Sequence, residues 1–149
     1  MKCSKNVLIQ IPPVRLIEGT ERRMAEAEVN LKATYAKVEV RDKGTGLYTV
    51  DGYGLEYFRS LQAREIFMTP LIVTDLLGEV DIIGNITDGP GGASVIPRII
   101  RQGASLCIAA LFPEHFDKLR LAGLLTHDPR TRERCKINQK GARAKWICS

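Results

Sequence analysis

The fold of this chain is decided by one alternating stretch, which reads Ala33-Thr34-Tyr35-Ala36-Lys37-Val38-Glu39-Val40-Arg41. From Thr34 to Val40 every second residue is small or apolar, and the residues between them are polar or aromatic. Successive side chains of a strand point to opposite faces, so this period of two predicts a strand with one buried and one exposed face. Turn residues follow at 42–46, and they predict a hairpin in which residues 47–50 form the returning strand.

The residues on either side of this hairpin predict further strands and helices. In chain order, we expect an extended segment at 7–17 broken by Pro12-Pro13, a helix at 20–31 capped by Thr20, one or two short helices at 55–67 ended by Pro70, a strand at 79–87, a turn at 88–92, a helix at 94–111 and a helix at 113–124. The helix at 94–111 requires Pro97 to lie in its first turn, where a proline is tolerated. Together these elements predict an α+β domain, a small sheet with helices on one face.

Positive charge is concentrated in the last third of the chain. From Lys118 onward there are nine Lys and Arg residues and two acidic residues, a net charge of +7, whereas the whole chain carries +5. Asp128-Pro129 stops the preceding helix, and the residues beyond it show no apolar period. We therefore expect an extended basic arm at 126–149, which a phosphate-rich partner would attract.

The composition also speaks against several classes of protein. Cys3, Cys107, Cys135 and Cys148 are scattered without a C-x-x-C pair, which favours reduced thiols over a zinc site, and Cys107 reads as a small core residue. No apolar run approaches the roughly 18–20 residues of a membrane span. The opening residues 1–11 lack the small-residue cleavage site of a secretory signal. We expect neither a metal nor another cofactor.

The start of the basic arm resembles a known family. Ala122-Gly123-Leu124-Leu125-Thr126-His127-Asp128-Pro129-Arg130, followed by Arg132-Glu133-Arg134, is similar to the end of the small-subunit ribosomal protein nine family, in its bacterial and organellar form. Upstream, Lys32 to Val38 resembles the family's K-T-S-x-A-R-V strand, and Thr74 to Gly78 resembles its T-D-x-L-G. The resemblance covers about residues 32–146. It implies the fold of the second domain of ribosomal protein five.

The resemblance also implies how the chain is organised and what it binds. Residues 1–31 would be an N-terminal extension, residues 32–125 the globular domain, and residues 126–149 the RNA-binding arm. The implied partners are small-subunit rRNA near the head and decoding region, neighbouring ribosomal proteins, and peptidyl-site tRNA through the arm. The expected rRNA-binding residues are Lys32, Lys37, Gly91, Gly92, Arg98, Arg101, Arg130, Arg132, Arg134, Lys136, Lys140, Arg143 and Lys145.

Departures from the family pattern shape the remaining expectations. The usual Lys-Arg ending is replaced by Ile147-Cys148-Ser149, which argues against the tRNA contact but not against rRNA binding. The family's Q-A-G before the late helix is replaced by Ile96-Pro97-Arg98. Such loss of basic and glycine positions favours a mitochondrial ribosome over a plastid or bacterial one.

Alternatives stay open for individual motifs and for the function. The glycines at 89–92 could cradle a phosphate or form a plain turn, and Arg98 and Arg101 could face RNA or solvent. A generic basic RNA-binding module and a small α+β enzyme compete with the ribosomal role, although His115 and His127 lack a nucleophile pattern around them. Residues 1–31 carry a net charge of +1 and many apolar residues, so we expect them to contact protein rather than RNA.

Overall fold

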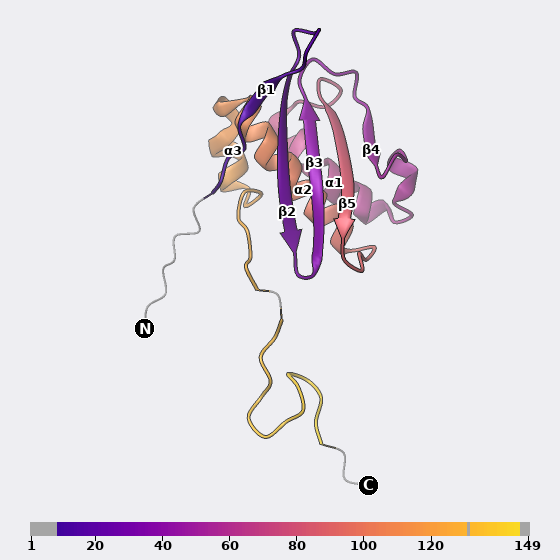
Figure 1. Cartoon of the computed structure of the whole chain (residues 1–149), viewed down its shortest axis with the longest axis vertical. Coiled ribbons are helices and arrows are strands. Elements are labelled where there is room, and N and C mark those ends of the chain that lie inside the picture. The colour runs from indigo at the N-terminus through magenta and orange to yellow at the C-terminus, as the bar shows by residue number, and fades with distance from the viewer. Residues whose placement is uncertain (1–8, 131, 147–149) are drawn as a thin grey trace.

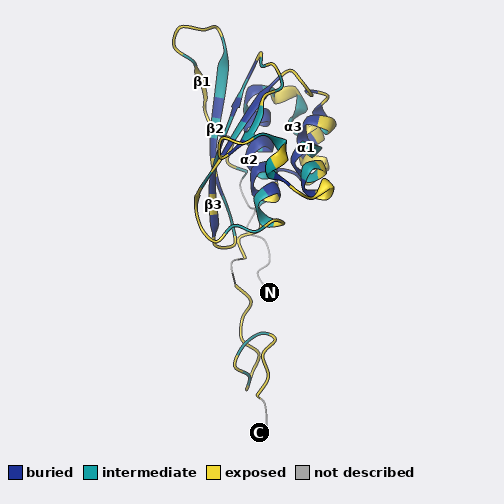
Figure 2. Ribbon diagram, turned by 90° about the vertical axis from the view of Figure 1, so that its right-hand side faces the viewer, coloured by how far each residue is buried: buried dark blue, intermediate teal, exposed yellow. Residues whose placement is uncertain are grey.

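A five-stranded sheet and three α-helices form two layers in the computed structural model, which describes residues 9–130 and 132–146 (Figures 1 and 2). The elements are β1 (Val14–Leu16), β2 (Arg23–Leu31), β3 (Thr34–Arg41), β4 (Tyr48–Val50), α1 (Leu61–Thr74), β5 (Asp81–Asp88), α2 (Val95–Leu111) and α3 (Phe116–Leu121), with 3-10 turns at Leu55–Tyr57 and Pro113–His115. The strand order is β1-β2-β3-β5-β4, and β4 pairs with β5 in parallel while the other pairs are antiparallel. The expected α+β fold, with helices on one face of the sheet, is confirmed.

The core lies between the sheet and α2. Alternate residues of β2 and β3 turn toward the helices and are buried, among them Ala27, Val29 and Val38. Gly103 lets α2 lie directly on this face, because a Cβ at that position would come within 2.6 Å of Val38 Cγ2. Small residues on both layers therefore set how closely the helix approaches the sheet.

The predicted helix at 20–31 is wrong, because most of that stretch is the strand β2. Its Ala, Glu and Met residues favour a helix intrinsically, but they also alternate, and Ala25 and Ala27 are buried while Glu26 and Glu28 are not. Pairing with β3 on one side and β1 on the other decides in favour of the strand. The part of the expected N-terminal extension at residues 14–31 thus packs on this protein's own sheet.

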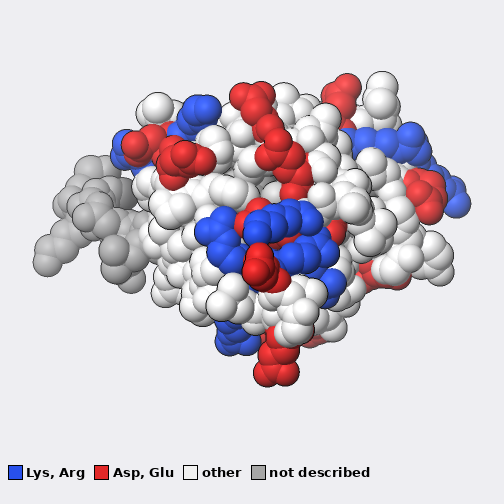
Figure 3. All heavy atoms as spheres, turned by 90° about the horizontal axis from the view of Figure 1, so that it is seen from above, with Lys and Arg blue, Asp and Glu red and all other residues white. Residues whose placement is uncertain are grey.

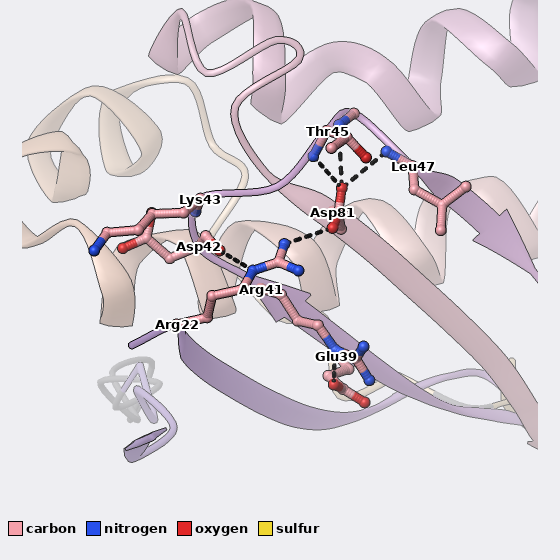
Figure 4. Close-up of polar contacts among 9 residues, drawn as sticks. Arg22, Glu39, Arg41, Asp42, Lys43, Thr45, Leu47 and Asp81 are labelled. Carbon is pink, nitrogen blue, oxygen red and sulfur yellow. Dashed lines mark hydrogen bonds and ion pairs between the residues drawn. The ribbon is translucent and has the colours of Figure 1, made fainter. Parts of the chain in front are cut away.

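The predicted hairpin between residues 33–41 and 47–50 is also wrong. β3 pairs with β2 and β5, and β4 lies on the far side of β5. The buried carboxylate of Asp81, at the start of β5, explains the crossing: it accepts hydrogen bonds from the backbone N–H groups of Thr45 (2.8 Å), Gly46 (3.1 Å) and Leu47 (2.9 Å) (Figure 4). Held this way, the segment passes over the start of β5 instead of turning back along β3.

Arg22 completes this polar cluster. Its guanidinium donates to Asp81 Oδ2 over 2.6 Å and to the carbonyl oxygen of Asp42 over 2.9 Å (Figure 4). Burial alone would raise the pKa of Asp81, but the hydrogen bond from Leu47 and the charge and hydrogen bond of Arg22 outweigh it, and the pKa is lowered. The cluster therefore joins the loop before β2, the end of β3 and the start of β5.

Apart from the absent helix at 20–31, the helices follow the sequence expectations with two exceptions. The strand β5 and the helix α2, with Pro97 in its first turn, are confirmed. Pro70 does not end the preceding helix, and α1 continues to Thr74. The hydroxyl group of Thr74 donates a hydrogen bond to the carbonyl oxygen of Pro70 over 2.8 Å. The last helix is shorter than residues 113–124, since it begins as a 3-10 turn and its α-helical part ends at Leu121, ahead of Gly123 at φ 74°.

Candidate nucleic-acid interface

Two loops and the start of α2 meet at the end of the sheet from which the C-terminal segment leaves (Figure 1). The β2–β3 turn carries Lys32 at φ 56°, and the loop after β5 carries Gly91 and Gly92. Gly89 lets this loop rest on the turn: at φ 102°, a Cβ there would come within 2.3 Å of the Ala33 carbonyl oxygen. The packing brings Lys32 to the same end as the glycine-rich loop.

Arg98 and Arg101 add positive charge beside this loop. They lie in the first two turns of α2, and Arg98 is exposed while Arg101 is half-buried. Burial and the neighbouring charge of Arg98 lower the pKa of Arg101, although a guanidinium stays protonated at neutral pH. Two mutually repelling cations at a helix N-terminus would be stabilised by an anion bound between them.

The root of the C-terminal arm is fixed on the helical layer. Leu124 and Leu125 are buried in the core, and the side-chain amide nitrogen of Gln102 donates to Nδ1 of His127 over 3.2 Å. No spacing in the sequence indicates this contact between His127 and α2. The arm therefore leaves the domain from a defined position.

Beyond its root, the arm carries its cations on exposed side chains. The described residues 126–130 and 132–146 contain no helix or strand, and a local turn is closed by a hydrogen bond from Gln139 N to the Lys136 carbonyl oxygen over 3.1 Å. Trp146 packs there under Lys140, whose Nζ lies 4.8 Å from the ring centroid. The expectation that residues 126–149 are extended stays a prediction, and Thr131 and residues 147–149 lie outside the described part of the chain.

Two of the predicted arm cations are already paired with acids of the arm. Arg130 donates to both carboxylate oxygens of Asp128, and these hydrogen bonds lower the pKa of Asp128 to about 2. Arg143 pairs with Glu133 over 2.9 Å. The other five have no ion-pair partner among the residues described: Arg132, Arg134, Lys136, Lys140 and Lys145.

Lys37 does not join this group. It lies on the open face of the sheet, where it forms an ion pair with Glu26 that raises its pKa. On the same face Glu39 accepts from Arg41 over 2.6 Å, and Glu28 is exposed. Acidic side chains outnumber basic ones among these five, so this face offers little attraction to phosphate.

The opposite end of the sheet carries charges of both signs. Seen from that end, positive and negative side chains are intermixed over the surface (Figure 3). Arg22 and Arg23 there are paired with Asp81 and Asp42, at 2.6 and 2.7 Å. The paired arginines of this end contrast with the five cations of the arm that have no ion-pair partner among the described residues.

Other types of site find little support in the described residues. Residues 9–130 and 132–146 contain no group of three His, Cys, Asp or Glu side chains that could hold a metal ion. None of the helices in that part of the chain is long and apolar enough to cross a bilayer. Cys107 is buried in the core as predicted, and burial raises the pKa of its thiol to about 12, which makes it unreactive.

The chain is similar in sequence to proteins named as small ribosomal subunit proteins. The chain is 47% identical over 152 residues to Small ribosomal subunit protein uS9m of Caenorhabditis elegans, an alignment that takes in 92% of this chain and 39% of the relative. It is 42% identical over 105 residues to Small ribosomal subunit protein uS9 of Maridesulfovibrio salexigens, covering 70% of this chain and 79% of the relative. The chain thus spans about two fifths of the worm relative's length and about four fifths of the bacterial one's.

The family match is wider than the resemblance read from the sequence. The family described as Ribosomal protein S9/S16 matches residues 20–149, so the match includes β2, whereas the resemblance read from the motifs began at residue 32. It also includes the glycine-rich loop and the basic arm. The chain therefore belongs to the Ribosomal protein S9/S16 family.

Proposed function

We propose that this chain is a structural component of the small subunit of a mitochondrial ribosome and that it binds rRNA without catalysing a reaction. Family membership supports the ribosomal role, and the 47% identity to a relative named uS9m supports the mitochondrial setting. Neighbouring small-subunit proteins would be its other partners. A contact with peptidyl-site tRNA, and a position near the head and decoding region, are finer proposals that rest on the family resemblance.

The observation that carries the proposal is the division of charge over the molecule. Five exposed arm cations lack an acidic partner among the described residues, and Lys32, Arg98 and Arg101 lie at the end of the domain from which the arm leaves. Ion pairs with acidic residues offset Lys37 and Arg41 on the open sheet face, and likewise Arg22 and Arg23 at the opposite end. A polyanion would therefore approach from the arm side, where its phosphates release counterions on binding.

The recognition expected here depends on the shape of the RNA more than on its base sequence. Lys and Arg side chains contact phosphates for the most part, and these contacts position a protein without reading bases. The backbone N–H groups of a glycine-rich loop at a helix N-terminus contact phosphates in the same way. We accordingly assign rRNA binding to Lys32, Lys37, Gly91, Gly92, Arg98, Arg101 and the arm cations as a proposal, and Lys37 is the weakest of them because Glu26 neutralises it.

The test measures salt-dependent affinity of the full chain for small-subunit rRNA. Changing Arg132, Arg134 and Lys136 together to Gln removes three exposed cations of the arm. The slope of log K against log salt should become shallower by roughly 0.7–0.9 for each phosphate that the variant no longer neutralises. The matched control changes Lys43, Arg59 and Lys118 to Gln, which removes the same charge from exposed positions of the domain.

The outcome separates the ribosomal role from its alternatives. An equal reduction of the slope in both triple variants would mean that net charge alone drives binding, as in a generic basic RNA-binding module. A ribosomal protein should also sediment with small subunits at moderate salt, whereas a small enzyme should stay in the supernatant.

A further inference from the structure

The outer edge of β2 is only partly covered by β1. Their pairing begins at Leu16↔Arg23 and ends at Val14↔Ala25, although β2 continues to Leu31. Extending the same register would place Pro13 opposite Glu26, and a proline has no N–H to donate to the ladder. Pro12-Pro13 therefore ends β1 and leaves the second half of this edge without a strand partner among the described residues.

The backbone groups along this edge point outward. Arg23 accepts from Asp42 N, on the β3 side, while Arg22 accepts from Ile17 N, on the β1 side, over 2.9 and 3.0 Å. The same alternation turns the backbone N–H and C=O groups of Glu26, Glu28 and Asn30 toward the uncovered edge. No backbone hydrogen bond to this edge occurs within the described residues. Such a row of donors and acceptors is a template for an added strand.

A groove runs along the uncovered edge. The chain before β1 diverges from β2, and the space between them has a volume of about 610 Å³. It is lined by β2, by Ile9 and Ile11 of the diverging segment, and by Leu106, Leu125 and Gln102 of the helical layer and arm root. This size lies within the roughly 300–1,000 Å³ of ligand-binding clefts, and the far wall is largely apolar.

Charge decides which kind of strand the groove fits. Side chains of an added strand that lie beside Ala27 and Val29 would point toward the apolar lining, because those two residues face the helices. Side chains that lie beside Glu26 and Glu28 would point to the open sheet face, where acidic residues predominate. Opposite charges pair favourably across neighbouring strands, so basic residues are preferred at those positions.

We propose that this groove binds an extended segment of a neighbouring protein, with alternating apolar and basic residues, as an added strand on the outer edge of β2. The mode is strand addition, in which backbone hydrogen bonds supply affinity and alternate side chains supply specificity. RNA is disfavoured because the acidic rim repels phosphate. None of the residues that line the groove is among the rRNA-binding residues proposed above, so this inference can fail while rRNA binding holds.

The experiment uses the full chain and a capped octapeptide of alternating Lys and Val. The peptide is kept below the concentration at which its own circular dichroism shows β structure. Binding should protect the amides of Glu28 and Asn30 from hydrogen exchange, and an octapeptide of alternating Glu and Val should bind far more weakly. Glu28→Lys should weaken binding about fivefold, because a favourable charge pair becomes a repulsive one. The matched control is Glu65→Lys on the exposed surface of α1, which should leave the affinity unchanged.

Two N-methylated peptides test whether the backbone pairs. One carries N-methyl groups on the Lys residues and the other on the Val residues, so side-chain charge and shape are kept in both. If the strand is added antiparallel, only the Lys set blocks binding, and if it is added in parallel, only the Val set does. Either result supports the proposal. Peptide binding that survives both modifications would overturn the proposal, and so would the absence of binding at millimolar peptide. It would also be overturned if Glu28→Lys and Glu65→Lys changed the peptide affinity equally, or if residues of this chain before Ile9 occupied the edge.

Discussion

Gly103→Ala should destabilise the domain, although alanine is the better helix former. Gly103 lies in the middle of α2, fully within the helical layer and facing the sheet. A Cβ at this position would lie 2.6 Å from Val38 Cγ2, 2.7 Å from Val38 Cβ and 3.2 Å from Val29 Cγ2. Carbon atoms in van der Waals contact lie roughly 3.5–4.0 Å apart, so α2 or the strands must move.

The magnitude follows from two opposing effects. Replacing Gly by Ala inside a helix gains about 1 kcal/mol from backbone entropy. Adding a methyl group to a well-packed core costs about 1–3 kcal/mol, and this site lies at the upper end, because Val38 is fully buried in a central strand and its branched side chain cannot rotate away. The free energy of unfolding should therefore fall by about 1–2 kcal/mol.

The assay is urea unfolding of the full chain, followed as a double-mutant cycle with Val38→Ala. Val38→Ala alone should cost about 2 kcal/mol, because it leaves a cavity in the core. In the double variant the methyl group added by Gly103→Ala occupies part of that cavity, so the combined destabilisation should be smaller than the sum by about 1–2 kcal/mol. Gly141→Ala is the control, since a Cβ there would meet Ala144 Cβ only at 3.6 Å. A Gly103→Ala variant as stable as the parent chain, or strict additivity in the cycle, would refute the packing argument.

Three further predictions concern single side chains. Folding lowers the pKa of Asp81, so the ionised carboxylate stabilises the fold at pH values above the unfolded pKa of about 3.9, and this stability is lost as the pH falls through the folded pKa. Asp81→Asn should therefore lower the free energy of unfolding by about 1–3 kcal/mol in urea at pH 7 and by much less at pH 3. The Cys107 thiol, with a pKa of about 12 and no exposure, should react with a thiol reagent only on unfolding, whereas exposed Cys135 should react at once; rapid labelling of Cys107 in the folded chain would contradict its burial. Gln102→Ala removes the side-chain hydrogen bond to His127, so amides at 124–127 should exchange faster while those of the sheet stay unchanged, and unaltered exchange would mean that burial of the leucines alone holds the arm root.

The chain itself determines those features that depend on local pattern or on summed charge. Period two identified β3, the β-branched residues identified β5, and the position of Pro97 identified the start of α2, because each signal lies within one element. The excess of cations after Lys118 and the motif at 122–130 were equally visible, since charge and motif need no partner strand to be read. The family resemblance rested on these same local features, and the match over residues 20–149 established the family.

Tertiary structure alone decided which elements pair and which charges stay uncompensated. The residues of β2 favour a helix by propensity and a strand by alternation, and only the neighbouring strands β1 and β3 select between the two. Asp81 redirects residues 45–47 across the start of β5, and Glu26 neutralises Lys37, through contacts between residues far apart in the chain. The uncovered edge of β2 also depends on tertiary structure. Pro13 ends the hydrogen bonding between β1 and β2 only in the register in which these strands pair, and the sequence carries no periodic signal of that register.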